Sequence, residues 1–212
     1  RFDVDNINSS TNFLLHIIND ILDFSKIESG SLNIENIPFQ PQETFTEISS
    51  LFEITAKRKA ISLEINTQQI GQKYFLGDPY RLKQILINLA TNAFKFTEDG
   101  SIKIHVFLDE TDSPWHNFTV TVTDTGIGIP REKQEQIFKE FSQADGSTSR
   151  LYGGTGLGLS ITRQIIHMMK GEIIVSSEIG KGSIFTFNFP LQKIAPPKKS
   201  SLPKSYLYTT LK

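Results

Sequence analysis

The 212-residue chain carries 22 Lys and Arg against 23 Asp and Glu, and it contains no cysteine. A net charge of −1 argues against electrostatic binding of nucleic acid, and the lack of thiols excludes disulfides, thiolate catalysis and cysteine-based zinc sites. No apolar run approaches the roughly 18 residues of a membrane span, so we expect no membrane contact within this segment. The lack of cysteine fits a reducing compartment, and we expect a cytoplasmic location, with membrane anchoring of the full-length protein as an open alternative. Because the chain begins at Arg1 rather than Met, we expect a piece of a longer protein.

Residues 1–30 predict one long helix that ends at Gly30. Apolar residues recur at spacings of three and four, from Val4 and Ile7 to Ile18 and Ile21, with a second apolar stripe beside them. An apolar arc of this width is typical of a four-helix bundle, and the sequence offers no second helix of similar length directly beside it. The opposite, polar face is expected in solvent and carries Asn12, His16, Asn19 and Asp23.

Residues 31–191 are expected to form a domain in which helices and strands do not alternate regularly. Such an order predicts an α+β fold with two layers. The expected helices cover residues 42–59, 79 onward, 130–138 and 157–169. The expected strands cover residues 61–65, 101–108, 118–123, 172–176 and 183–189. Residues 192–212, rich in Pro, Lys and Ser, predict a linker.

A first polar cluster lies on the helix that begins after the N-cap residue Asp78. Asn88 and Asn92 are four residues apart, and Lys95 follows one turn later, so the three share a helix face. Amide oxygens can bind Mg²⁺ without adding negative charge beside a triphosphate, and a lysine attracts phosphate. The alternative is a set of solvated polar residues on a helix surface.

A second cluster, Asp124-Thr-Gly126-Ile-Gly128-Ile129, follows a predicted strand. A carboxylate at this position can accept a hydrogen bond from an exocyclic amine such as that of adenine, and glycines allow a flat ligand to approach the backbone. A simple strand-to-helix turn, with Asp and Gly selected only for their backbone angles, would explain the same residues.

A third cluster, residues 153–159, opens a helix with four glycines in six residues. Backbone N–H groups at a helix N-terminus favour anions, so the cluster indicates phosphate binding, and the aperiodic stretch 142–155 before it could close over a ligand. A hinge is the alternative. The sequence contains no dinucleotide-binding G-x-G-x-x-G, Walker A loop, or protein-kinase H-R-D and D-F-G triplets.

The order and spacing of these clusters resemble the N, G1, F and G2 boxes of sensor histidine kinases. The matching residues are Asn88-x3-Asn92-x2-Lys95-Phe-Thr, Asp124-x-Gly126-x-Gly128-Ile129, Phe138-x2-Phe141 and Gly154-Thr-Gly156-Leu-Gly158. Residues 141–145 and 150–159 resemble the hybrid subgroup, whose members carry receiver domains downstream. Residues 18–28 resemble the second helix of the dimerisation and phosphotransfer hairpin of these kinases.

The resemblance implies the Bergerat fold of histidine kinases and gyrase-type ATPases, a two-layer α/β sandwich with a mixed sheet on one layer and three main helices on the other, preceded by one long bundle helix. It implies ATP and Mg²⁺ as ligands, with Asn92 on the metal and Asn88 beside it. Lys95 would support the phosphates, Asp124 would bind the adenine amine, and Arg150 would reach the γ-phosphate. The other implied nucleotide contacts are Gly126, Gly128, Ile129, Phe138, Gly154, Thr155, Gly156, Leu157 and Gly158.

Hydrolysing relatives carry a glutamate base where this chain has Asn88, and an amide cannot activate water. The family's phosphoacceptor histidine is followed by an acidic residue, whereas each of the four histidines here precedes a neutral one. The resemblance therefore implies a phosphoacceptor helix outside this segment, in the same protein or a dimer mate, within a full-length homodimer. A response regulator receiver domain is the second implied partner.

Two other functions remain open from the sequence. The same fold serves ATPases and Ser/Thr protein kinases, although both generally carry a carboxylate base where Asn88 stands. A module without catalysis, which keeps the nucleotide fold as a regulatory surface, is the other alternative.

Overall fold

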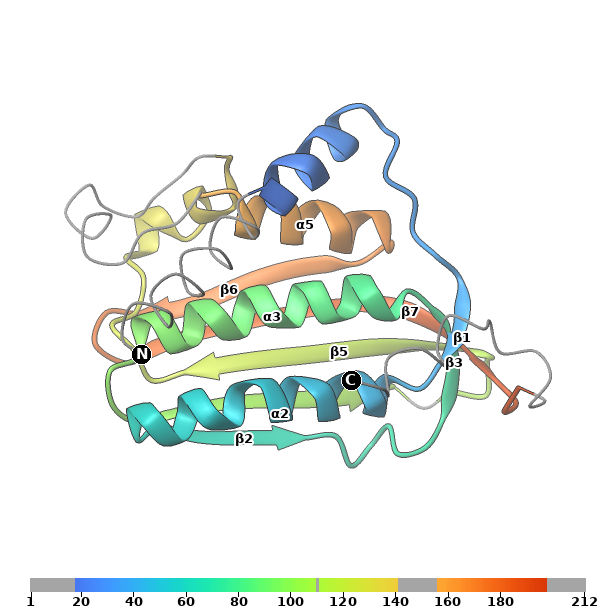
Figure 1. Ribbon diagram of the computed structural model, residues 1–212, viewed down its shortest axis with the longest axis horizontal. Coiled ribbons are helices and arrows are strands. Elements are labelled where there is room, and N and C mark those ends of the chain that lie inside the picture. The colour runs from blue at the N-terminus through green and yellow to red at the C-terminus, as the bar shows by residue number, and fades with distance from the viewer. Residues whose placement is uncertain (1–17, 110, 141–155, 198–212) are drawn as a thin grey trace, which may run out of the picture.

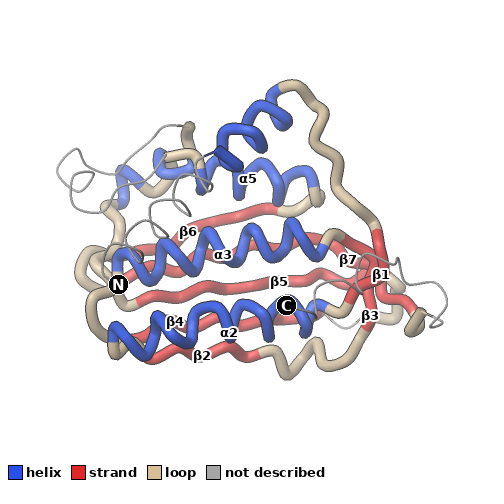
Figure 2. The backbone as a smooth tube through the Cα atoms, viewed as in Figure 1, coloured by secondary structure: helices blue, strands red, loops and turns tan. Residues whose placement is uncertain are grey.

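The computed structural model describes residues 18–109, 111–140 and 156–197. Its seven strands form one mixed sheet, and helices α2, α3 and α5 lie across one face of that sheet (Figures 1 and 2). This arrangement is the expected two-layer α+β sandwich. Within the described residues, no helix is both long and apolar enough to cross a membrane.

The three helices bury apolar stripes against the sheet. Helix α3 (Pro79–Phe96) begins where the Asp78 carboxylate accepts a hydrogen bond from the Arg81 N–H, with Pro79 in the first turn, as the sequence predicts. Helix α2 (Pro41–Lys59) covers one flank of α3, and α5 (Gly158–Met168) covers the other. Because α3 lies between α2 and α5, the polar residues along its flank are within reach of a neighbouring helix.

The strand order is β1-β3-β7-β5-β4-β2, and β6 pairs with β7 beyond this path. The long strand β7 pairs with β5 from Ser183 to Gln192 and with β3 from Gln192 to Ile194. Among the strand pairs of the described residues, only β2 and β4 are parallel. The bounds are β1 (Ile37–Phe39), β2 (Ser62–Asn66), β3 (Tyr74–Gly77), β4 (Ser101–Leu108), β5 (Trp115–Asp124), β6 (Glu172–Glu178) and β7 (Gly182–Ile194).

The core lies between the helices and the sheet and is rich in phenylalanine. Phe118, Phe187 and Phe189 are fully buried, and Phe45 of α2 lies over the Phe118 ring at 6.2 Å between centroids. Such rings bury large apolar areas, which stabilises the central strands β5 and β7. The packed β5–β7 pair thereby holds Asp124 beside Ser183, since the two residues are partners in the register.

Two strands that the sequence analysis did not predict, β1 and β3, extend the sheet at one end. They have three and four residues, too few for a visible alternation. Strand β7 also runs to Ile194 rather than ending at Phe189. Pro190 lies between the last partner of β6 and the first partner of β3, so its missing N–H leaves no cross-strand acceptor unsatisfied on that side.

The expected helix over 130–138 is two short 3₁₀ turns, η1 (Arg131–Lys133) and η2 (Gln136–Phe138).

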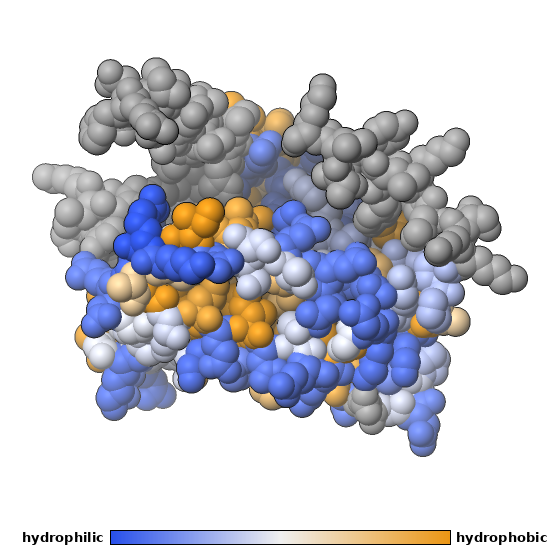
Figure 3. Space-filling model, turned by 60° about the horizontal axis from the view of Figure 1, so that its bottom comes forward, coloured by the Kyte–Doolittle hydropathy of each residue, from blue (hydrophilic) through white to orange (hydrophobic). Residues whose placement is uncertain are grey.

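One outer region of the molecule remains apolar. Leu51 and Ile54 of α2 are 51% and 76% exposed, and Figure 3 shows apolar side chains among hydrophilic ones on the side turned forward from the bottom of Figure 1.

The helix over 18–28 corrects one expectation about its polar face. Asp23 is buried rather than solvated, because its carboxylate accepts hydrogen bonds from Arg81 at 3.1 Å and Gln84 at 2.7 Å. Asn19 is exposed, as expected. The apolar Ile18 and Ile21 are about half exposed, so this helix docks on the domain partly through an acidic side chain. His16 and Asn12 lie outside the described residues.

Candidate active site

The Asp124 carboxylate lies at the end of β5, where the inner face of the sheet meets the loop 125–130. It is 6% exposed, and the Gly126 N–H donates to its Oδ1 at 2.8 Å. Burial raises the pKa of Asp124, while hydrogen bonds from Gly126 and from the backbone and hydroxyl of Ser183 oppose that rise. A shielded carboxylate held in this way is suited to accept a hydrogen bond from a neutral amine.

The loop that follows Asp124 packs against the C-terminal end of α3. The Ile127 N–H donates to the Phe96 carbonyl at 3.2 Å. A Cβ on Gly126 would collide with the same carbonyl, and a Cβ on Gly128, whose φ is +74°, would collide with the Glu178 backbone. These contacts require glycine at both positions without any ligand, so they support the turn alternative given above and add a steric reason to it.

The β6–β7 hairpin ties down the other side of this loop. The Ser177 hydroxyl accepts a hydrogen bond from the Ile129 N–H at 2.7 Å, and the Gln134 side-chain amide donates to the Ile129 carbonyl at 3.0 Å. Ser183 meets Asp124 from the neighbouring strand. Ser177, Ser183 and Gln134 are not recognisable as site residues from the sequence, because their importance depends on cross-strand register and packing; their one sequence signal is the Gly180-x-Gly182-Ser183 turn.

Three predicted residues share one stripe of α3. Asn88, Asn92 and Lys95 are all half-buried, at the spacing of successive turns. Burial lowers the pKa of Lys95, whose Nζ lies 4.9 Å from the centre of the Phe96 ring. Desolvation of this kind makes an anionic partner favourable, because it would compensate a charge that has lost part of its water.

The start of α5 meets this stripe at close range. The Asn88 side-chain amide donates to Thr162 Oγ1 at 2.7 Å, a contact that the sequence analysis missed. A Cβ on Gly158 would lie 2.5 Å from Asn88 Oδ1, and Gly156 has a φ of +70°. Leu157 is buried in the core. Arg150, Gly154 and Thr155 lie outside the described residues.

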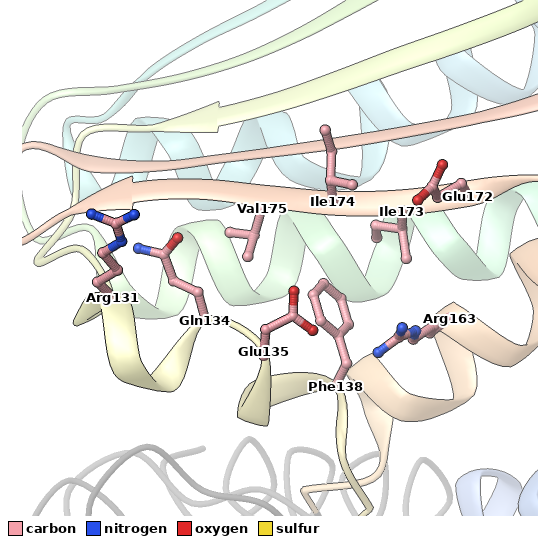
Figure 4. Close-up of a pocket in the computed structure, with 9 residues that line it drawn as sticks. All are labelled: Arg131, Gln134, Glu135, Phe138, Arg163, Glu172, Ile173, Ile174 and Val175. Carbon is pink, nitrogen blue, oxygen red and sulfur yellow. The ribbon is translucent and has the colours of Figure 1, made fainter.

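Phe138 belongs to η2 and is buried in the core. Its ring packs edge-on against Phe185 at 6.3 Å, and the Arg163 guanidinium lies 5.5 Å above it. It lines a cavity of about 370 Å³ along β6, together with Gln134, Glu135 and Arg163 (Figure 4). Among the described residues, none of the other predicted nucleotide contacts lines this cavity, and the role of Phe138 at the nucleotide stays a prediction.

A divalent cation fits the α3 stripe only in company with other oxygen ligands. Across the described ranges, no three His, Asp or Glu side chains come close enough to hold a metal by themselves. Mg²⁺ commonly takes one or two protein oxygens and completes its shell with phosphate oxygens and water. The Asn92 amide oxygen provides a donor of that kind.

Comparison with known proteins agrees with this geometry. Residues 77–193 match the family described as histidine kinase-, DNA gyrase B- and HSP90-like ATPases. The chain is similar to the signal transduction histidine-protein kinase BarA of Escherichia coli K12, with 43% identity over 191 residues. The match covers 90% of this chain and 21% of BarA, so the chain spans about a fifth of that relative's length.

Solved structures give the same result. Full-length ShkA in complex with AMPPNP superposes with a TM-score of 0.75 at 29% identity, over 95% of this chain and 41% of ShkA. The nucleotide-free catalytic domain of the histidine kinase ThkA superposes with a TM-score of 0.58 at 32% identity, over 75% of this chain and 96% of that domain.

Proposed function

Since the chain belongs to the family of histidine kinase-, DNA gyrase B- and HSP90-like ATPases, as the ATP-binding catalytic domain of a sensor histidine kinase, we propose that it transfers the γ-phosphoryl group of Mg-ATP to a histidine outside residues 1–212. The observation that carries this proposal is the junction of Asp124 with the end of α3. Gly126 bridges the two, because a Cβ there would meet both the Phe96 backbone and the Asp124 carboxylate.

Each residue of the junction has a role in this proposal. Asp124 accepts the adenine amine, and Lys95 directs its ammonium group at the phosphates. Asn92 supplies an amide oxygen to Mg²⁺, which when bound offsets the charge of the transferring phosphoryl group. The proposed phosphate contacts are Gly154, Thr155, Gly156, Leu157 and Gly158, and the proposed contact of the γ-phosphate is Arg150. Gly128 and Ile129 form the wall beside the base, and Phe138 supports it from behind.

Asn88 favours transfer over hydrolysis. An amide has no basic site that could take a proton from water, and the Asn88 amide is already engaged with Thr162. The chain therefore positions ATP while leaving water without a base at this point of the site. We expect slow turnover of ATP in the absence of a phosphoacceptor.

The rest of the protein completes the reaction. The acceptor histidine lies on a hairpin helix of the same protein or of a dimer mate, and the exposed Ile18 and Ile21 belong to the helix that would pair with it. A receiver domain then takes the phosphoryl group; the related kinase ThkA has been solved in complex with the response regulator protein TrrA. Residues 1–30 serve as the second hairpin helix, 31–191 as the catalytic domain, and 192–212 as a linker.

Phosphoryl transfer in trans tests this function. The chain is mixed with γ-labelled ATP, Mg²⁺ and a hairpin fragment from a related kinase that carries the acceptor histidine. We expect acid-labile label on the hairpin fragment and none on the 212-residue chain. Failure to bind ATP at millimolar concentration, or acid-stable label on serine or threonine, would exclude the proposal.

A further inference from the structure

The inner face of the sheet changes character at one row of residues. Two neighbouring rows across β5, β7 and β6 are apolar: Val122, Phe185 and Val175 in one, and Val120, Phe187 and Ile173 in the next. The row at the loop end is instead polar throughout and consists of Asp124, Ser183 and Ser177. Polar groups at the margin of an apolar core are costly unless they are hydrogen-bonded, so this row needs a reason.

Hydrogen bonds join Asp124 to Ser183, and Ser177 lies within hydrogen-bond distance of Ser183 at the other end of the row. Ser183 donates to the Asp124 carboxylate through both its backbone N–H and its hydroxyl. Ser177 Oγ lies 3.1 Å from Ser183 Oγ and 2.7 Å from the Gly182 carbonyl. A hydroxyl has one proton, so Ser177 serves one of these acceptors at a time, while its lone pairs accept the Ile129 N–H. Ser177 thus links the carboxylate row to the loop that follows Asp124.

Gln134 reinforces the same link from outside the sheet. Its side-chain amide donates to the Ile129 carbonyl at 3.0 Å and to the Ser177 carbonyl at 2.8 Å. The side chain reaches from the turn between η1 and η2 towards β6, as Figure 4 shows. Ile129 is therefore held through both its N–H and its carbonyl, once by Ser177 and once by Gln134.

We propose that Ser177, supported by Gln134, is a positioning residue for adenine recognition: it fixes Ser183 and the loop 125–130 so that the Asp124 carboxylate meets the exocyclic amine of the base. The proposal rests on the proposed function, and it assigns a role to two residues without expected ligand contact. A carboxylate aimed by neighbours discriminates between bases more sharply than one free to rotate, because misaligned hydrogen bonds weaken steeply.

The test compares the affinities of ADP and inosine diphosphate, measured by calorimetry on the full 212-residue chain. Inosine presents a carbonyl where adenine presents the amine, so only ADP gains from an aligned carboxylate. We expect Ser177→Ala to weaken ADP about five- to tenfold and inosine diphosphate less than twofold, in the range of one lost hydrogen bond. The matched control is Ser176→Ala, the exposed neighbour on the opposite face of β6, which should leave both affinities unchanged.

Equal weakening of both nucleotides by Ser177→Ala, or no change in their ratio, would overturn the proposal. If that variant does not fold, Gln134→Ala takes its place, with its exposed neighbour Glu135→Ala as the control. It should lower the ADP preference about two- to threefold, and an unchanged preference again counts against the idea. Absence of ADP binding to the unsubstituted chain would instead reject the proposed function itself.

Discussion

The two sides of the candidate nucleotide site are constructed differently. The adenine side, made of Asp124, the loop 125–130 and the Ser183–Ser177 row, is held by hydrogen bonds that involve the backbone. The phosphate side, made of Asn88, Asn92 and Lys95, consists of side chains on one helix, with the Asn88–Thr162 hydrogen bond joining it to α5. The adenine side is thus organised before the base arrives, whereas the phosphate side depends on side chains that a ligand can rearrange.

This difference assigns separate tasks to the two sides. Preorganised groups lose little entropy when a ligand binds, so the adenine side is suited to selecting the base. The phosphate side holds the half-buried cation Lys95 and the amide oxygen of Asn92. Groups of this kind are suited to stabilise the charge that develops on a phosphoryl group during transfer. Substitutions on the adenine side should therefore alter specificity, and those on the phosphate side should alter catalysis.

The largest expected effect on function falls on catalysis. Asn92→Ala removes the protein oxygen proposed for Mg²⁺, and we expect phosphoryl transfer to a hairpin fragment to fall about a hundredfold, equivalent to about 2.7 kcal/mol. ADP binding should lose its dependence on Mg²⁺ while its affinity in EDTA stays the same. Thr91→Ala, an exposed neighbour on α3, is the control. If ADP binding to Asn92→Ala keeps its full dependence on Mg²⁺, Asn92 is not a ligand of the metal.

Next in size is the loss of base selection. Asp124→Asn keeps the shape of the side chain but replaces one acceptor oxygen with a donor. We expect ADP to bind about thirtyfold more weakly, since hydrogen bonds to charged groups contribute about 1.5–3 kcal/mol. Inosine diphosphate should bind as before or better, because the new amide can donate to its carbonyl.

Competition between the two nucleotides for each variant measures this switch. Asp109→Asn, at an exposed position beyond β4, serves as the matched control. Equal losses for ADP and inosine diphosphate would mean that Asp124 acts on stability rather than on the base.

Backbone packing on the adenine side predicts an effect on stability. A Cβ on Gly182, whose φ is +98°, would collide with the Asp124 backbone, whereas Gly180, with a φ of +77°, has open space around it. Gly182→Ala should therefore lower the free energy of unfolding by about 3 kcal/mol and Gly180→Ala by about 1 kcal/mol. Urea denaturation measures both free energies of unfolding, and equal losses would show that the β6–β7 hairpin shifts enough to accommodate the added Cβ.

The fold followed from the sequence wherever a pattern was long enough to be distinctive. Asp78-Pro79 predicted the start of α3, and alternation predicted β4 and much of β5. The short strands β1 and β3 had no such pattern. The polar face of the first helix was assigned to solvent, because the Arg81 that buries Asp23 is 58 residues away in the chain.

The site divides in the same way. Asn88, Asn92, Lys95 and Asp124 stand out because their residue types and spacings have chemical meaning in isolation, and their roles stay predictions. Ser177, Ser183 and Thr162 are ordinary hydroxyls until register and packing place them beside Asp124 and Asn88. For Gly126 and Gly128 the sequence left a flat ligand and a simple turn as alternatives, and backbone contacts within the protein already require glycine at both positions.

The two sides should also separate by pH. Burial raises the pKa of Asp124 and lowers that of Lys95, and ADP needs both in their charged forms. ADP affinity should fall as the pH drops through the raised pKa of Asp124, and again as it climbs through the lowered pKa of Lys95. Lys95→Gln should remove the alkaline fall alone. Persistence of that fall in Lys95→Gln would assign it to another group.

Stability without nucleotide should change in the opposite sense. The raised pKa of Asp124 favours its neutral form in the folded chain, so that contribution is present at low pH and is lost as the pH rises through the folded pKa. The lowered pKa of Lys95 penalises folding while the group is charged, so stability should rise with pH between its folded and its ordinary values. Thermal melting of the unliganded chain, followed at acidic pH for Asp124 and at alkaline pH for Lys95, measures both trends.

The smallest expected effect tests whether the two sides are independent. Thr162 is 2% exposed, and Thr162→Val keeps its shape while removing the oxygen that accepts from Asn88. The loss of one hydrogen bond should cost about 1 kcal/mol in the free energy of unfolding. Thr46→Val is the control, since that hydroxyl bonds only within the exposed surface of α2. Because Asn88 lies on the phosphate side, the ratio of ADP to inosine diphosphate affinity should stay constant, even if both affinities change a few-fold. A changed ratio would mean that the α3–α5 contact reaches Asp124 through the end of α3, and that the site acts as a single unit.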